Sequence, residues 1–124
     1  MDNLLIYWID CLQLSDWKIK LSVDVTEMPE SDTAGCVQYQ EAGKQAHIYI
    51  IRPDLYGERV SPFDPEKTLV HELLHLKMCL LDCPEGNLQS RVLHQLIDDL
   101  AKALVRARRE NKCFNDVRKG GEVG

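Results

Sequence analysis

The 124-residue sequence contains little of what marks disordered, fibrous or membrane-spanning chains. Glycine and proline contribute only seven and five residues, and 44% of the residues are hydrophobic, which excludes collagen-like and low-complexity structures. No stretch approaches 18 uncharged apolar residues, so we predict no membrane-spanning helix and no membrane partner. These absences indicate a globular protein, and the length suits a single domain.

Cysteine pairs with regular spacing are also missing. The sequence contains five cysteines, an odd number, which argues against a complete disulfide framework. None of them forms a CxxC pattern, which argues against a zinc ribbon. A reducing compartment fits this pattern, so we expect a cytoplasmic protein. The first residues, Met1-Asp2-Asn3, are not basic, and Asp10 interrupts the apolar run that follows, so we predict no secretion signal.

An excess of positive charge is absent as well. The formal net charge of −5 argues against a surface built mainly for nucleic acid. Basic residues nevertheless gather between Arg106 and Lys119. Cations near the C-terminal end of a helix complement its dipole, so we interpret this stretch as a solvated helix end and expect no nucleic-acid partner.

Apolar residues predict one short helix and three strands in the first half of the chain. Their loose helical spacing over residues 4–14 indicates a helix, and strict alternation over 17–25 indicates a strand with one buried face. Residues 36–40 and 45–51 have the composition of two further strands. The four residues 41–44 between them predict a hairpin.

Two longer helices are predicted in the second half. Asp64 and Pro65 suit an N-cap and a first helical turn, and they predict a helix that ends near Asp82. Apolar residues return to a helical spacing between Leu88 and about Arg109, after a short connection. We expect this second helix to pack antiparallel against the first.

The predicted fold class is therefore α+β. An N-terminal helix precedes a three-stranded, mainly antiparallel sheet, and the two longer helices follow it. We assign residues 1–114 to one domain and residues 115–124 to a flexible C-terminal tail.

The first of the two longer helices carries the HExxH pattern His71-Glu72-Leu73-Leu74-His75. Residues four apart lie on one face of a helix, so His71 and His75 can bind a single zinc ion while Glu72 contacts a water on that ion. The helix is apolar around most of its circumference, so this narrow polar sector must face a cleft or satisfied partners. The pattern predicts a metal site.

A catalytic zinc needs a third protein ligand, and the second longer helix offers His94, Asp98 and Asp99. Antiparallel packing places His94 level with the region just past His75, and Asp98 level with His71. His94 and Asp98 share one border of the apolar stripe, whereas Asp99 lies on the other. We favour His94 as the ligand and expect Asp98 to accept a hydrogen bond from a ligating imidazole; Asp98 remains the alternative ligand.

At this pattern the sequence resembles the zincin metallopeptidases. The region from Gln45 to Leu104 is similar to the gluzincin branch in a minimal, single-domain form, as in the minigluzincins. Gluzincins carry a glutamate ligand about twenty residues beyond HExxH and an aspartate four residues further on. His94 and Asp98 occupy these positions here, so a histidine replaces the glutamate. Phage-associated and repressor-cleaving zincins of the ImmA type have similar domains.

The resemblance implies a zinc-dependent peptidase with one zinc ion per chain and Glu72 as the general base. It also implies that the strand 45–51 lies at the edge of the cleft and binds an extended peptide or protein substrate by backbone pairing. Tyr56, in the loop after that strand, and His47, within it, are the candidates for an oxyanion donor.

A zincin-fold regulatory or latent protein is the alternative hypothesis. Such a protein binds the metal but acts through protein interaction. A chain of this length leaves few residues to build the walls of a cleft, and the tail offers Asp116 and Glu122 as carboxylates that can fold back over the metal.

Overall fold

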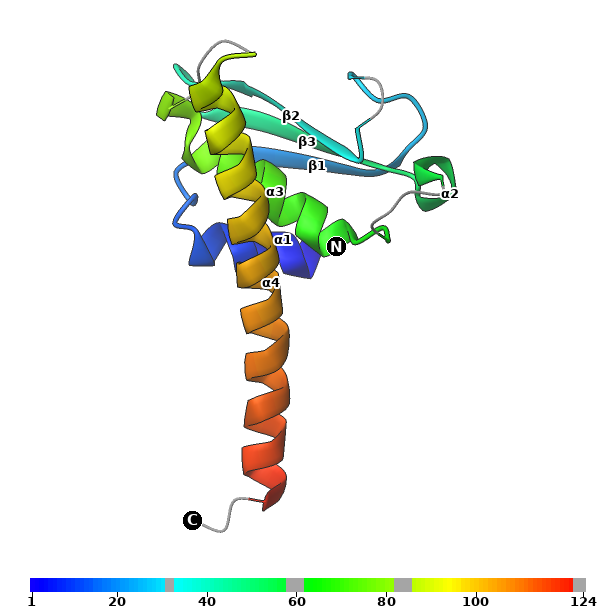
Figure 1. The fold of residues 1–124 in the computed structure, drawn as a ribbon, viewed down its shortest axis with the longest axis vertical. Coiled ribbons are helices and arrows are strands. Elements are labelled where there is room, and N and C mark those ends of the chain that lie inside the picture. Colours follow the sequence, from blue (N-terminus) through cyan, green and yellow to red (C-terminus); the bar gives the residue numbers. More distant parts are fainter. Residues whose placement is uncertain (31–32, 58–61, 82–85, 122–124) are drawn as a thin grey trace.

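The α+β class is confirmed by the computed structural model, which describes residues 1–30, 33–57, 62–81 and 86–121 (Figure 1). Within these residues an N-terminal helix precedes a three-stranded sheet, and two packed helices follow. The elements are α1 (Asp2–Cys11), β1 (Lys18–Val25), β2 (Gly35–Gln40), β3 (Gln45–Ile51), α2 (Pro53–Tyr56), α3 (Pro65–Lys77), the 3₁₀ turn η1 (Cys79–Leu81) and α4 (Leu88–Gly121).

The sheet of the described residues is mixed, with the strand order β1-β3-β2. β2 and β3 form the predicted hairpin and pair antiparallel, with Val37 opposite Ile48. β1 lies on the other side of β3 and runs parallel to it, with Leu21 opposite Ile48. The predicted mainly antiparallel arrangement therefore holds for one strand pair and not for the other.

The prediction that strand 45–51 lies at the edge of the sheet is wrong. This strand is β3, and its backbone pairs with β1 on one side and with β2 on the other. A strand whose backbone groups are used on both sides has none left for a peptide substrate. Burial alternates along β3, and Ala46, Ile48 and Ile50 are buried on the face that meets the core.

The core forms where α3 packs between the sheet and the other helices (Figure 1). α3 contacts β2 and β3 with one side and α1 and α4 with others. It is consequently apolar on several sides, and Leu69, Val70, Leu73, Leu74 and Leu76 are all buried. A helix enclosed in this way has a fixed position, so side chains on its remaining polar sector are held in place.

The N-terminal end of α3 agrees with the predicted cap, and its C-terminal end is described only in part. The Asp64 side chain accepts a hydrogen bond of 3.2 Å from the Lys67 backbone N–H, with Pro65 at the first helical position, as predicted. α3 ends at Lys77 and a short 3₁₀ turn follows, and the predicted end at Asp82 lies outside the described residues.

α4 continues beyond the predicted boundary at Arg109, as far as Gly121. The apolar spacing weakens after that boundary, but no proline or glycine occurs before Gly120 to end the helix. That residues 115–124 are flexible stays a prediction. Although α4 is long, no helix among the described residues combines the length and the apolar character needed to cross a membrane.

A buried carboxylate fixes α4 against α1 and α3. Glu66 on α3 accepts hydrogen bonds from the Trp8 indole N–H at 2.9 Å and from the Arg108 guanidinium at 2.6 and 2.8 Å. Arg109 adds contacts to Glu66 and to Asp64. Burial raises the pKa of Glu66, but these partners outweigh it and hold the pKa below its ordinary value. The charged cluster thereby ties three helices together.

Candidate metal centre

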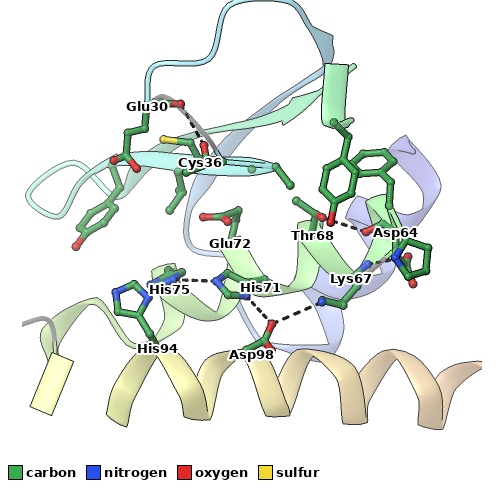
Figure 2. A pocket seen from close by; sticks show the side chains of 18 of the residues that line it. Glu30, Cys36, Asp64, Lys67, Thr68, His71, Glu72, His75, His94 and Asp98 are labelled. Carbon is green, nitrogen blue, oxygen red and sulfur yellow. Dashed lines mark hydrogen bonds and ion pairs between the residues drawn. The ribbon is translucent and has the colours of Figure 1, made fainter. Parts of the chain in front are cut away.

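Three histidines from α3 and α4 converge at one point (Figure 2). His71 and His75 lie one turn apart on α3, and His94 comes from α4. Each offers one ring nitrogen, and these nitrogens all lie within 4.8 Å of one another. The ring centroids of His75 and His94 are 4.9 Å apart. The structure thus contains a three-histidine cluster that could hold a metal ion.

The distance between the two α3 histidines suits ligands of a shared ion. At a zinc–nitrogen distance of about 2.0–2.1 Å, two ligands of a tetrahedral ion lie roughly 3.3 Å from each other. The Nε2 atoms of His71 and His75 are 3.2 Å apart. A hydrogen bond between two imidazoles has a similar length, but it does not account for the approach of His94. Because His94 is exposed, its ring can turn toward the other two.

Asp98 lies behind His71 rather than within the histidine cluster. One of its carboxylate oxygens is 3.6 Å from His71 Nδ1, which leaves Nε2 directed at His75. Two lysines also form ion pairs with the Asp98 carboxylate. Lys102 Nζ lies 2.9 Å from one of its oxygens, and Lys67 Nζ lies 3.6 Å from the other. Burial raises the pKa of Asp98, but these lysines outweigh it and hold the pKa below its ordinary value, so the group is a carboxylate at neutral pH.

These contacts confirm the antiparallel register expected of the two helices. His75 meets His94, which comes early in α4, and His71 meets Asp98, which lies one turn later. Burial lowers the pKa of His71 even though the Asp98 charge opposes that change. His71 is therefore a neutral imidazole at pH 7, which is the form that binds a metal.

Glu72 is held between α3 and β2, above the histidines (Figure 2). Its side chain is buried, with 8% of the residue exposed. Burial, together with the nearby charge of Glu30, raises the pKa of Glu72 to about 8. A carboxyl group that titrates near neutral pH can both take up and release a proton there.

Glycine at position 35 makes this close approach of strand and helix possible. A Cβ atom added to Gly35 would lie 2.4 Å from Thr68 Cγ2 and 3.3 Å from Glu72 Oε2. β2 therefore passes over α3 at a distance that admits no side chain at this point.

The cluster opens into a cavity of about 770 Å³ between α3, α4 and β2. β2 contributes Gly35, Cys36, Val37 and Tyr39 to its wall. β2 pairs with β3 along one side, and its other side has no partner strand among the described residues. The strand edge that borders the site is thus β2, in place of the predicted strand 45–51.

The two predicted oxyanion donors have different surroundings. Tyr56 lies at the end of α2 and lines the same cavity, with its ring 5.1 Å from the ring of Phe63; its role as a donor stays a prediction. His47 alternates along β3 with buried residues and so points to the other face of the sheet. There its Nε2 is 2.7 Å from Ser22 Oγ, and its ring stacks on Tyr49. His47 is part of the sheet surface.

Sequence reasoning missed Lys67, Gly35 and Cys36. Lys67 precedes His71 by one helical turn, so the same spacing that relates His71 to His75 would have placed it beside the site. Gly35 directly precedes the predicted strand 36–40, and no local pattern indicates that it approaches α3. The Cys36 thiol is buried in the cavity wall, and burial raises its pKa to about 11, so it is a protonated, unreactive thiol at pH 7.

The chain matches no protein-family model, no curated protein and no solved structure. Its class is defined by the fold and by the site: an α+β domain whose two packed helices carry a three-histidine cluster suited to a metal ion. Any more specific function is argued from the residues of the site.

Proposed function

We propose that this protein is a zinc-dependent peptidase of the zincin type, similar to the minimal gluzincins. His71, His75 and His94 hold one zinc ion, and Glu72 is the general base. The observation that carries this proposal is the convergence of the three histidines beside a buried glutamate, in a cavity bordered by a strand edge.

The donor set favours zinc over harder cations. Three imidazole nitrogens suit zinc and related transition metals, whereas calcium and magnesium prefer oxygen ligands. Neutral histidines leave the full charge of the ion in place, and the buried neighbour Glu72 can balance part of it. When bound, zinc supplies a Lewis acid that polarises a substrate carbonyl and lowers the pKa of water.

Glu72 performs the proton transfers of peptide hydrolysis. Its carboxylate removes a proton from the attacking water and then delivers that proton to the amine of the leaving peptide. Without metal the pKa of Glu72 is about 8; the positive charge of a bound zinc ion would favour the carboxylate form that takes up the proton.

Asp98 positions the first ligand. Its carboxylate faces His71 Nδ1 and keeps the proton of the ring on that nitrogen, so that Nε2 is free to bind the ion. Lys102 and Lys67 hold Asp98 in place from either side. This arrangement favours His94 over Asp98 as the third ligand.

An extended peptide or protein substrate pairs with β2. No strand of the described residues pairs with the outer edge of β2, so this edge can accept a further strand. The wall residues 35–37 bring that edge over the site. We therefore still propose that the substrate is bound by backbone pairing, but with β2 instead of strand 45–51.

The test compares wild type with Glu72→Gln, each purified without added metal and then loaded with zinc. We expect both to bind one zinc ion, and only wild type to cleave casein or a mixture of fluorogenic peptides. Loss of cleavage of at least about 10²-fold is expected when the general base is removed. Equal cleavage by both proteins would contradict the assigned role of Glu72.

A metal-binding protein that acts through protein interaction is the alternative. Zinc binding without any cleavage by wild type would support it. A latent form in which Asp116 folds back onto the metal is not compatible with a continuous α4. Asp116 lies 22 residues beyond His94, about 33 Å along the helix axis. The other candidate for blocking the metal, Glu122, lies outside the described residues.

A further inference from the structure

The charged groups that line the cavity are mostly acidic. Among the described residues the lining includes a single ammonium group, that of Lys67, and the carboxyl groups of Glu30, Asp64, Glu72 and Asp98. Basic side chains already form ion pairs with Asp64 and Asp98, and Glu72 is the proposed general base. Glu30 is the remaining acid, and it has no role in the proposed mechanism.

Glu30 lies at the rim of the cavity, shortly before the edge strand β2. It is exposed, and it shares a wall of the cavity with Cys36 of β2 (Figure 2). Burial raises the pKa of the Cys36 thiol, and the negative charge of Glu30 adds to this rise, so the carboxylate lies close to the strand. Within the described part of the chain, no cationic side chain forms an ion pair with Glu30. Its charge is therefore available to a ligand.

The single lysine of the lining does not cancel the charge of Glu30. Lys67 Nζ lies 3.6 Å from an oxygen of Asp98, on the side of the cavity formed by α3 and α4, whereas Glu30 lies on the side formed by β2 (Figure 2). A peptide that pairs with β2 lies on the side of Glu30. The charge it meets there is negative.

The sequence around β2 extends this negative charge. All charged residues between positions 21 and 43 are acidic, namely Asp24, Glu27, Glu30, Asp32 and Glu41. Glu27 and Glu41 are exposed like Glu30. A cleft whose border carries charge of one sign raises the local concentration of ligands of the opposite sign. The β2 side of the cavity therefore attracts a cationic segment and repels an acidic one.

We infer that the substrate segment that pairs with β2 carries a lysine or arginine side chain, and that Glu30 binds this cation. The inference rests on the proposed function, since it names the class of peptide that the same site accepts. Gly35 lies against Glu72, and the next residue of β2 is the one near Glu30. The basic residue is thus expected close to the cleaved bond. Val37 on the same wall can contact the aliphatic part of such a side chain while its charged end reaches the carboxylate.

Binding of matched peptides tests the inference without requiring cleavage. Three short fluorescein-labelled peptides with blocked ends differ only in their central residues, which are lysine, norleucine or glutamate. Norleucine keeps the carbon chain of lysine and lacks the ammonium group. Fluorescence anisotropy measures their Kd on the zinc-loaded Glu72→Gln protein.

The lysine peptide is expected to bind about fivefold more tightly than the norleucine peptide, which is the upper end for one ion pair in contact with solvent. The glutamate peptide is expected to bind most weakly. Raising the salt concentration is expected to reduce the difference between the lysine and norleucine peptides, because salt screens the attraction.

Substitutions in the same protein identify the carboxylate responsible. Glu30→Gln is expected to bring the affinities for the lysine and norleucine peptides to within about twofold of each other. Glu30→Lys is expected to make the glutamate peptide bind more tightly than the lysine peptide. Glu27→Gln is the matched control, because Glu27 is exposed in the same acidic segment but does not line the cavity. It is expected to keep the preference for lysine.

These measurements separate the inference from the peptidase proposal. If the lysine peptide binds preferentially but zinc-loaded wild type cleaves none of the peptides, the peptidase proposal fails and the binding preference stands. If wild type cleaves them, kcat/KM is expected to rank the peptides in the same order. Equal binding of all three peptides, binding of none, or equal effects of Glu27→Gln and Glu30→Gln would overturn the inference.

Discussion

Burial acts on His71 and Glu72 in opposite directions, although the two residues are adjacent. It lowers the pKa of the imidazole and raises that of the carboxyl group to about 8. In both cases the neutral form is favoured, because a charge without solvent is costly. Without metal, neither of these two side chains is favoured as a charged group at pH 7.

The raised pKa of Glu72 predicts how the stability of the metal-free protein depends on pH. Between its ordinary value of 4.5 and about 8, the unfolded state has lost a proton that the folded state keeps, so the free energy of unfolding falls as pH rises. The slope is at most about 1.4 kcal/mol per pH unit. Urea unfolding of chelator-treated protein at pH 6 and pH 7.5 measures it. Glu72→Gln is expected to remove this slope, and an unchanged slope in that variant contradicts the burial of the group.

Glu66 is buried to a similar degree but behaves in the opposite way, because it has cationic partners. Its lowered pKa adds stability above the ordinary value of 4.5, and that stability is lost as pH falls through the folded-state pKa. We expect Glu66→Gln to lower the free energy of unfolding at pH 7 by about 3 kcal/mol, with a smaller effect at pH 3.

The control for Glu66 is Asp54→Asn, which removes the partner of Arg52 in a solvent-exposed ion pair. It is expected to leave stability nearly unchanged at both pH values. Equal effects of the two substitutions in urea unfolding would mean that Glu66 does not tie the helices together.

At the scale of the elements, the contact between β2 and α3 depends on Gly35. Gly35→Ala brings a Cβ atom to 2.4 Å from Thr68 Cγ2, and the Thr68 rotamer is held by a hydrogen bond of 3.0 Å to the Asp64 carbonyl. We expect a loss of about 1–3 kcal/mol, measured by thermal unfolding.

Thr68→Ser provides the matching rescue, because serine keeps the hydroxyl group and lacks the methyl group. The double variant Gly35→Ala/Thr68→Ser is expected to recover most of the lost stability. If the double variant is as unstable as Gly35→Ala alone, the strand and the helix do not meet at this contact.

Local patterns predicted the elements that depend on local physics. Alternation from Trp17 to Val25 predicts a strand, and the four residues between β2 and β3 predict their hairpin. The same patterns could not predict strand order, since the position of β1 beside β3 depends on contacts far apart in the sequence. For that reason the sequence could not show that strand 45–51 is central or that β2 is an edge strand.

The candidate site could be predicted further than the sheet, because helices have a regular rise. Counting residues from the predicted helix ends brought His94 level with the α3 histidines and Asp98 level with His71, and both relations hold in the structure. Gly35 and Cys36 could not be found in this way, since they reach the site through the tertiary placement of β2.

At the scale of the whole molecule, the histidine cluster joins α3 to α4 at one end, and the Glu66 cluster joins them at the other. A metal bound by three histidines is therefore expected to stabilise the fold, since it binds only when the two helices are packed. At a free zinc concentration of 100 times the Kd the gain is about 2.7 kcal/mol.

Thermal unfolding with and without zinc measures this coupling. Wild type is expected to melt at a higher temperature with zinc, whereas His75→Ala is expected to show no such shift. Cys11→Ser is a suitable control for nonspecific binding to an exposed thiol, and it is expected to shift like wild type. An equal shift in His75→Ala would place the binding elsewhere.

The most direct test of the metal centre is elemental analysis of zinc in protein purified untagged, for wild type, His94→Ala and Gln95→Ala. The three-histidine cluster predicts one zinc ion per chain in wild type and in the neighbouring exposed control Gln95→Ala, and a loss of zinc in His94→Ala. Folded wild type that holds no zinc even after zinc is supplied, or equal zinc in all three proteins, would contradict it.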